Sequence, residues 1–177
     1  MRWGAACLAA ALVAGCATAP APAPDAASAT LAGRMSVHVA ATATAQARDV
    51  TATFDLQGTP QQGKLDLATP LGTVLAQARW SPGRVALVTS QGERRYPSLD
   101  ELTREVLGES LPVAALFDWL RGRPWPGAPS TPASAASGPG FEQLGWAVSL
   151  ARFDEGLIAA QRAQAPLVTV RAKLDRP

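Results

Sequence analysis

The chain has 177 residues, a formal net charge of +2 at pH 7 and 47% hydrophobic residues. This length suits one folded domain, and a near-neutral charge without a basic cluster lacks the electrostatic footprint of a nucleic-acid-binding protein. A single histidine also leaves little material for a catalytic triad.

The first fifteen residues have the pattern of a secretion signal. Arg2 precedes an apolar stretch over residues 3–13 that is too short to cross a bilayer as a helix. The sequence Val13-Ala14-Gly15-Cys16 then has the spacing of a lipobox, in which the cysteine is acylated before cleavage. We therefore predict a signal peptide over residues 1–15 and a lipid on Cys16.

Cysteine usage supports this interpretation. Cys7 would leave with the signal peptide, so Cys16 would be the one thiol of an exported chain, and acylation accounts for it. The alternative is an ordinary signal peptide followed by a free or disulfide-bonded cysteine. Ala17 stands where aspartate is the usual inner-membrane retention signal in enterobacteria, which favours the outer membrane, with the domain facing the periplasm.

Two segments are rich in proline, alanine and small polar residues. Residues 17–30 cannot form a core, and we expect residues 16–30 to be a lipidated tether. At about 3.1 Å per residue in polyproline II form, this tether reaches on the order of 40 Å. The folded domain is predicted over residues 31–177, with a mobile loop over residues 126–140.

Apolar and polar residues alternate through most of this domain, which predicts antiparallel strands with one apolar face. Turns are expected at residues 81–83 and 90–92. The apolar positions of the alternating runs are Met35, Val37, Val39, Val50, Ala52, Phe54, Leu56, Leu65, Leu67, Val74, Ala76, Ala78, Trp80, Val85, Leu87, Trp146, Val148, Leu150, Val168, Val170, Ala172 and Leu174.

The period changes to that of a helix in two places. Ser98-Leu99-Asp100-Glu101 has the spacing of a capping box, and apolar residues follow at helical intervals as far as Gly108. Pro112 suits the first turn of a second helix, whose apolar residues end before Gly122. We expect both helices to cover the apolar sheet face, which would form either a packed core or an apolar cavity.

The segment Thr69-Pro70-Leu71-Gly72 predicts a tight turn between two strands. Proline at its second position and glycine at its fourth suit a type I turn, which puts Leu71 at the tip. The alternative is that Leu71 folds back onto the sheet as part of the core.

No catalytic arrangement is evident. His38 lies on the polar side of the first strand, where a solvated or hydrogen-bonded role is expected. Asp100, Glu101 and Glu105 are explained by a capped, solvated helix, although a carboxylate pair from distant strands stays open. We therefore predict that the protein is not an enzyme and needs no metal or nucleotide cofactor.

At this point the chain resembles the LolB family of outer-membrane lipoprotein receptors, over residues 31–174. No single motif is diagnostic, but their order and spacing behind a lipobox are specific. The motifs are Gly33-Arg34-Met35-Ser36-Val37, Leu65-Asp66-Leu67-Ala68-Thr69-Pro70-Leu71-Gly72, Leu107-Gly108, Leu111-Pro112-Val113, Leu116, Trp119-Leu120-Arg121-Gly122 and Phe141-Glu142-Gln143-Leu144-Gly145-Trp146.

The resemblance implies an incomplete β-barrel with a helical lid over a cavity for the acyl chains of lipoproteins. The donor would be the periplasmic carrier LolA, and the product a lipoprotein in the inner leaflet of the outer membrane. The family's membrane-delivery loop maps onto Pro70, Leu71 and Gly72. Our candidates for the cavity lining are Phe54, Leu65, Leu67, Trp80, Leu116, Phe117, Trp119, Leu120 and Trp146.

A second function, from another class, is a structural or assembly lipoprotein of the outer membrane. Such a protein would dock a partner protein and would have no acyl cavity. Ordinary core packing of Trp80, Trp119, Trp125 and Trp146 would suit it. In both interpretations we expect a monomer.

Overall fold

The computed structural model describes residues 29–175, so the predicted signal peptide, Cys16 and tether residues 17–28 lie outside the described residues. Eleven strands form one antiparallel sheet in the order β6-β5-β4-β3-β2-β1-β11-β10-β9-β8-β7. The strands are β1 (Ala29–Val39), β2 (Arg48–Gly58), β3 (Gly63–Ala68), β4 (Val74–Ser81), β5 (Arg84–Thr89), β6 (Gly92–Tyr96), β7 (Ser130–Pro132), β8 (Gly140–Gln143), β9 (Trp146–Ser149), β10 (Leu157–Arg162) and β11 (Val168–Leu174).

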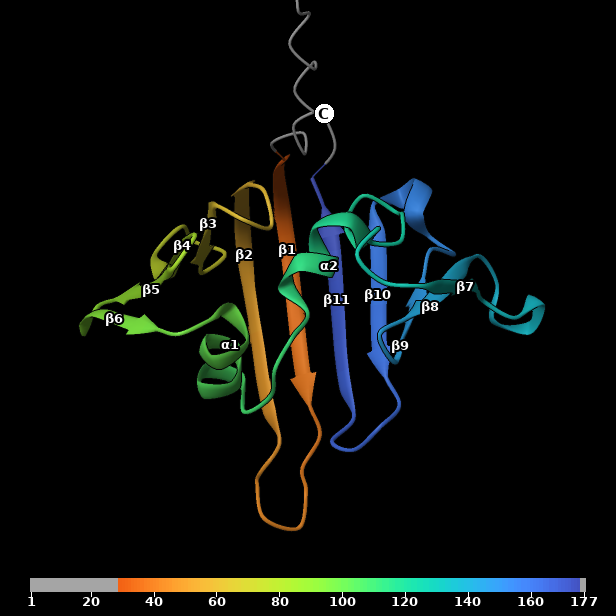
Figure 1. Cartoon of the computed structure of the whole chain (residues 1–177), viewed down its shortest axis with the longest axis horizontal. Coiled ribbons are helices and arrows are strands. Elements are labelled where there is room, and N and C mark those ends of the chain that lie inside the picture. Colours follow the sequence, from red (N-terminus) through yellow and green to blue (C-terminus); the bar gives the residue numbers. More distant parts are fainter. Residues whose placement is uncertain (1–28, 176–177) are drawn as a thin grey trace, which may run out of the picture.

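The sheet is curved and does not close into a barrel. Figure 1 shows the central strands face on, the outer strands turned away at both sides, and the two helices lying over one face. Strands β6 and β7 are its unpaired edges. The predicted class, a mainly β protein with an open antiparallel sheet and short helices, is confirmed.

Alternation in the sequence produces the apolar inner face. In β2, Ala52, Phe54 and Leu56 are buried, and the residues between them are partly exposed. Trp80 of β4 packs its ring on Gly63 of β3, where a Cβ atom would lie only 2.7 Å from the ring. Glycine at that position therefore makes room for a large aromatic side chain in the core.

Both predicted helices are present, as α1 (Leu99–Leu107) and α2 (Val113–Trp119). The side chain of Ser98 accepts a hydrogen bond from the Glu101 N–H at 3.1 Å, and Gly108 ends α1 with φ of 83°. These caps confirm the predicted bounds of α1. Pro112 precedes the first turn of α2 as its N-cap, and α2 ends at Trp119, before the predicted stop at Gly122. Within residues 29–175 no helix is long and apolar enough to span a membrane.

The sequence patterns did not predict strands β6, β7, β8 and β10. Strand β1 also begins at Ala29, two residues before the predicted start of the domain, because Ala29 and Thr30 pair with Gly58 and Gln57 of β2. The segment predicted as a loop over residues 126–140 contains β7 and a 3-10 turn at Ala135–Ser137. Backbone pairing with β8 holds β7 in place, although its composition is typical of loops.

Candidate functional site

An aromatic cluster fills the space between the sheet and α2. Phe117 and Trp119 of α2 are each 1% exposed. The ring of Phe117 meets Trp80 edge to face, with centroids 5.8 Å apart, and the ring of Trp119 lies 6.0 Å from Trp146. A further edge contact joins Trp119 to Phe141 at 6.4 Å. Helix α2 is therefore fixed to both halves of the sheet by large apolar side chains.

The structure brings all nine candidate cavity residues together in one apolar cluster. Phe54, Trp80, Phe117, Trp119, Leu120 and Trp146 are buried, whereas Leu65, Leu67 and Leu116 are partly buried against them. These residues pack with one another in the structure, so their role as a lining for acyl chains stays a prediction. Trp125, which we did not place among them, packs against the same cluster.

A buried glutamine joins α2 to the sheet, and sequence reasoning missed it. Gln143 is 2% exposed. Its Oε1 accepts hydrogen bonds from the Trp119 indole at 2.8 Å and the Trp125 backbone N–H at 2.9 Å. Its Nε2 donates to the carbonyl oxygens of Trp125 and Ala128 at 2.7 and 2.8 Å. A polar residue on the inward side of a strand, two positions after Phe141, was the available signal.

Helix α1 is held at its C-terminal end by polar contacts near the surface. Arg48 of β2 donates to the Val106 carbonyl at 3.1 Å, and Arg94 of β6 lies 2.5 Å from the Glu105 carboxylate. Thr103 accepts a hydrogen bond from the Leu111 N–H at 3.0 Å, which fixes the connection to α2. Exposed ion pairs contribute little stability, so α1 is attached more weakly than α2.

One partly buried ion pair joins the α1–α2 connection to the sheet. Arg162 of β10 donates to Glu109 at 2.9 Å and to the Pro166 carbonyl at 3.1 Å. Its guanidinium also lies over the Trp146 ring, 5.8 Å from the centroid. The buried Nε of Arg162 has no hydrogen-bond partner among the described residues. This contact closes the end of the sheet where β10 turns into β11.

The predicted turn after β3 is present. The Gly72 N–H donates to the Thr69 carbonyl at 2.9 Å, and Gly72 has φ of 87°. Leu71 is 95% exposed, so it does not fold back onto the sheet. Val74 and Leu75, at the start of β4, are also exposed, and the three side chains give this hairpin end an apolar character.

A polar network on β3 and β4 supports the hairpin that carries this turn. Asp66 accepts hydrogen bonds from Lys64, at 3.0 Å, and from Gln77. Burial acts to raise the pKa of Asp66, but the hydrogen bonds from Gln77 and Lys64 and the charges of Lys64 and Arg79 outweigh it, so the pKa lies below its usual value. The charged carboxylate therefore stabilises the hairpin.

His38, Glu101 and Glu105, which were considered for catalysis, have structural partners. His38 Nδ1 is 2.7 Å from Asp49 Oδ1 on the neighbouring strand, at the surface. Glu101 and Glu105 of α1 are paired with Arg104 and Arg94. Within the described part of the chain, no group of three potential ligands is placed to hold a metal ion.

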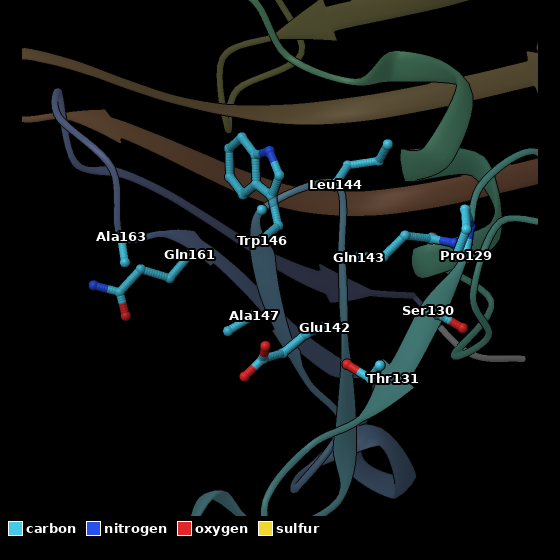
Figure 2. Close-up of a pocket in the computed structure, with 11 residues that line it drawn as sticks. Pro129, Ser130, Thr131, Glu142, Gln143, Leu144, Trp146, Ala147, Gln161 and Ala163 are labelled. Atoms are coloured by element: carbon cyan, nitrogen blue, oxygen red, sulfur yellow. The ribbon is translucent and has the colours of Figure 1, made fainter.

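A recess of about 340 Å³ lies beside β7, β8 and β9 (Figure 2). Its lining mixes polar side chains, such as Thr131 and Glu142, with the apolar side chains of Pro129 and Leu144, and Trp146 is the only candidate cavity residue in it. Figure 2 shows Gln143 directed toward the segment that carries Pro129. The recess therefore differs in position and chemistry from the predicted acyl site.

An open antiparallel sheet, two helices over its apolar face and an exposed apolar turn define a mainly β protein whose curved sheet is covered by helices. The sequence model of the family described as "Outer membrane lipoprotein LolB" matches residues 29–173. The chain therefore belongs to the LolB family. Membership in this family confirms the predicted location, which is the outer membrane with a lipid anchor. It also indicates a part in lipoprotein localisation.

Named relatives carry the same description, outer-membrane lipoprotein LolB. The protein of Bordetella petrii is 34% identical, in an alignment that covers 94% of this chain and 88% of the relative. That of Ralstonia nicotianae is 40% identical over 64% of this chain and 54% of the relative. That of Cupriavidus pinatubonensis is 38% identical over 58% of this chain and 51% of the relative, so these two alignments span about half of the relatives.

Gln143→Leu should destabilise the fold by about 3 kcal/mol or more. The change leaves two donors and two carbonyl oxygens without their partner, at about 1–3 kcal/mol for each group that stays buried. Denaturant unfolding measures the free energy. Gln161→Leu is the matched control, because this exposed glutamine should tolerate the change within about 0.5 kcal/mol. Equal effects of both variants would contradict the role assigned to Gln143.

The stability that comes from Asp66 should be lost in acid. Its folded-state pKa is lowered below its usual value, so its contribution is complete above the unfolded pKa and disappears as pH falls through the folded pKa. Asp66→Asn should therefore be less stable than wild type at neutral pH, and the difference should shrink in strong acid. Unfolding free energies measured across this pH range test this, and a constant difference would contradict it.

Proposed function

We propose that this protein accepts acylated lipoproteins from the soluble carrier LolA and inserts them into the inner leaflet of the outer membrane. The observation that carries the proposal is the pairing of two apolar features. One is the helix-covered inner face of an open sheet, and the other is Leu71, exposed on a turn outside that face. The first can take an acyl chain, and the second can contact a membrane.

Acceptance of cargo requires the helices to make room for an acyl chain. Helix α1 buries Leu102, Thr103 and Leu107, and its remaining attachments are largely exposed. Helix α2 is held by buried aromatic rings and by Gln143. Displacement of α1 would therefore break fewer buried contacts than displacement of α2. Burial of acyl chain contributes about 0.8 kcal/mol per methylene group, so a few enclosed methylene groups would offset the displacement.

The direction of transfer can come from a difference in affinity between carrier and receptor. A tenfold preference requires about 1.4 kcal/mol, which corresponds to about two additional buried methylene groups. We therefore propose that transfer from LolA proceeds without a nucleotide.

Release into the membrane would depend on the turn after β3. A leucine that enters the interfacial region gains about 1–2 kcal/mol from burial of its apolar surface. Leu71 is available to enter the membrane because it is exposed and does not belong to the core. Thr69 supports the turn, because its backbone N–H donates to the Thr73 carbonyl at 2.8 Å and its Oγ1 accepts from the Thr73 N–H at 3.1 Å.

The close ring contacts in the core favour a second candidate function. A structural lipoprotein that docks a partner protein would have a permanently packed core, as the contact of Trp119 with Trp146 suggests. The two functions differ in one experiment: a docking protein does not take lipoprotein from a loaded carrier.

Cys16→Ala should abolish lipidation and membrane fractionation and leave the domain from residue 31 onward folded. The physical reason is that a proline- and alanine-rich tether contributes little to the core. Mass spectrometry of the mature N-terminus, together with membrane fractionation, measures the effect. A free thiol at Cys16 in the wild-type protein would contradict the lipid anchor.

Leu71→Glu should separate receipt of cargo from its delivery. The fold and acceptance from loaded carrier should stay nearly intact, with a stability change within about 0.5 kcal/mol, because the position is exposed. Delivery to liposomes should fail, because a carboxylate is costly to desolvate. The measurement follows labelled lipoprotein from carrier to protein and from protein to liposomes.

Leu167→Glu is the control for this test. Leu167 is 46% exposed and follows β10, away from the turn that carries Leu71. Normal delivery by Leu71→Glu would show that the turn has no membrane role, and loss of acceptance would place Leu71 in the cargo site. If wild type accepts nothing from loaded carrier, the docking function is supported instead.

A further inference from the structure

Three cations lie together on the face of the central strands that is turned away from the helices. Arg34 of β1 is directly opposite Lys173 of β11, and Ser36 is directly opposite Arg171. Opposed residues of antiparallel strands lie about 5 Å apart, and alternate residues of one strand about 7 Å apart. Because Val37 is buried under the helices, Arg34 and Ser36 share the opposite face. Arg34, Arg171 and Lys173 are therefore one exposed cluster, which we call the basic cluster.

Within residues 29–175 the positive charge of the basic cluster is compensated only in part, because the charge of Lys173 helps to hold the pKa of Glu155 below its usual value. Arg34 and Arg171 form no ion pair and no side-chain hydrogen bond there. Lys173 Nζ donates to the carbonyl of Glu155, whose carboxylate is bound to Arg152 at 2.6 Å. Like charges directly opposite each other destabilise a sheet, so an anion would stabilise this arrangement.

The basic cluster borders a shallow recess of about 180 Å³, which is also lined by the hydroxyl-bearing residues Ser36 and Thr51 and by Met35, Leu157 and Ala172. Two guanidinium groups and one ammonium offer charge-assisted hydrogen bonds, and the hydroxyl groups add neutral ones. Phosphate has several acceptor oxygens and matches guanidinium groups bidentately. The chemistry of the recess therefore favours a phosphate-bearing anion.

The register of the sheet connects the basic cluster to the turn that carries Leu71. Thr53 of β2 is opposite Arg34, and Ala68 of β3 is opposite Thr53. Thr53 Oγ1 also donates to the Ala68 carbonyl at 3.1 Å, which is where the turn begins. With about 4.8 Å between neighbouring strands, Arg34 lies roughly 10 Å from the base of the turn. One lipid surface could therefore meet both features.

The predicted lipid anchor is connected to the end of the sheet near the basic cluster. The described chain begins at Ala29, and β1 starts at the same end of the sheet at which β11 ends (Figure 1). Residues 17–28 connect that end to Cys16. A lipid on Cys16 would therefore keep this end of the sheet, with Arg34 and Lys173, within the reach of the tether, on the order of 40 Å from the bilayer.

We propose that the basic cluster binds the phosphate of an anionic phospholipid headgroup and so orients the domain on the leaflet while Leu71 enters it. This inference rests on the proposed delivery function and adds the class of lipid that the protein recognises. Each cation near an anionic surface changes binding by about fivefold. Loss of all three should weaken docking by at least about tenfold.

The test uses the mature lipidated chain in vesicles, with an environment-sensitive fluorophore on Leu71→Cys. Acylation of Cys16 leaves this new thiol as the only one free to react. Vesicles of phosphatidylcholine are compared with vesicles of phosphatidylcholine and phosphatidylglycerol, at low and high salt. We expect the anionic vesicles to increase docking of the turn by at least tenfold at low salt, and high salt to reduce the increase.

The triple change Arg34→Gln, Arg171→Gln and Lys173→Gln should remove this increase. The matched control makes the same change in charge at exposed positions elsewhere, with Arg84→Gln, Arg95→Gln and Arg104→Gln, and should keep most of it. Unfolding midpoints show that both variants are folded.

Equal docking of wild type and the triple variant to anionic vesicles would overturn the inference. The inference would also fail if the control variant lost docking to the same extent as the triple variant. It would fail as well if free inorganic phosphate displaced the protein from anionic vesicles as effectively as added phosphatidylglycerol. If the fluorophore on the Leu71→Cys chain with an intact basic cluster enters neither kind of vesicle, the delivery function itself fails. Entry into both kinds without a lipid preference would leave delivery intact and remove only the headgroup site.

Discussion

An open sheet leaves the apolar face of its central strands without a second layer, and two short helices supply that layer. Complete burial of a large apolar side chain contributes about 1.5–3 kcal/mol, so Phe117 and Trp119 contribute much of the cover. Their positions depend in turn on Gln143, which orients the end of α2 against β8. The proposed uptake and release of an acyl chain would require one helix to stay fixed and the other to be displaced. Helix α2, held by buried rings, and helix α1, held largely by exposed contacts, differ in this way.

Short sequence motifs correctly predicted the elements whose ends are set by nearby residues, namely helix α1 and the turn after β3. The capping serine and the glycine stop defined α1, and the Pro-Leu-Gly turn after β3 formed with Leu71 at its tip. Strand β6, Gly-Glu-Arg-Arg-Tyr, has too few apolar residues to show alternation, and β10 has adjacent apolar residues on both faces. Strand β7 forms only because β8 pairs with it. These strands depend on neighbours that the sequence pattern of one segment does not identify.

The residues of the candidate site also fall into two groups, those that the sequence pattern predicted and those that it did not. Alternation and helical spacing placed the nine apolar residues in one cluster, because each lies on the inward side of its own element. Contacts between distant segments were not accessible, as with Gln143, with Glu109 and Arg162, and with Arg34 beside Lys173. These pairs come together through the register of the whole sheet, and a shift of one residue in a strand would turn each side chain to the other face.

The unpaired edges of the sheet have a consequence for a protein confined to a membrane. Anchoring in a plane raises the local concentration of copies, so exposed strand edges would meet one another far more often than in free solution. Strand β6 carries Glu93, Arg94 and Arg95 at its edge, and β7 has three residues and ends in Pro132. Charge, short length and a missing backbone donor are the features that prevent edge-to-edge pairing. These features oppose pairing between the sheet edges of neighbouring molecules at a crowded surface.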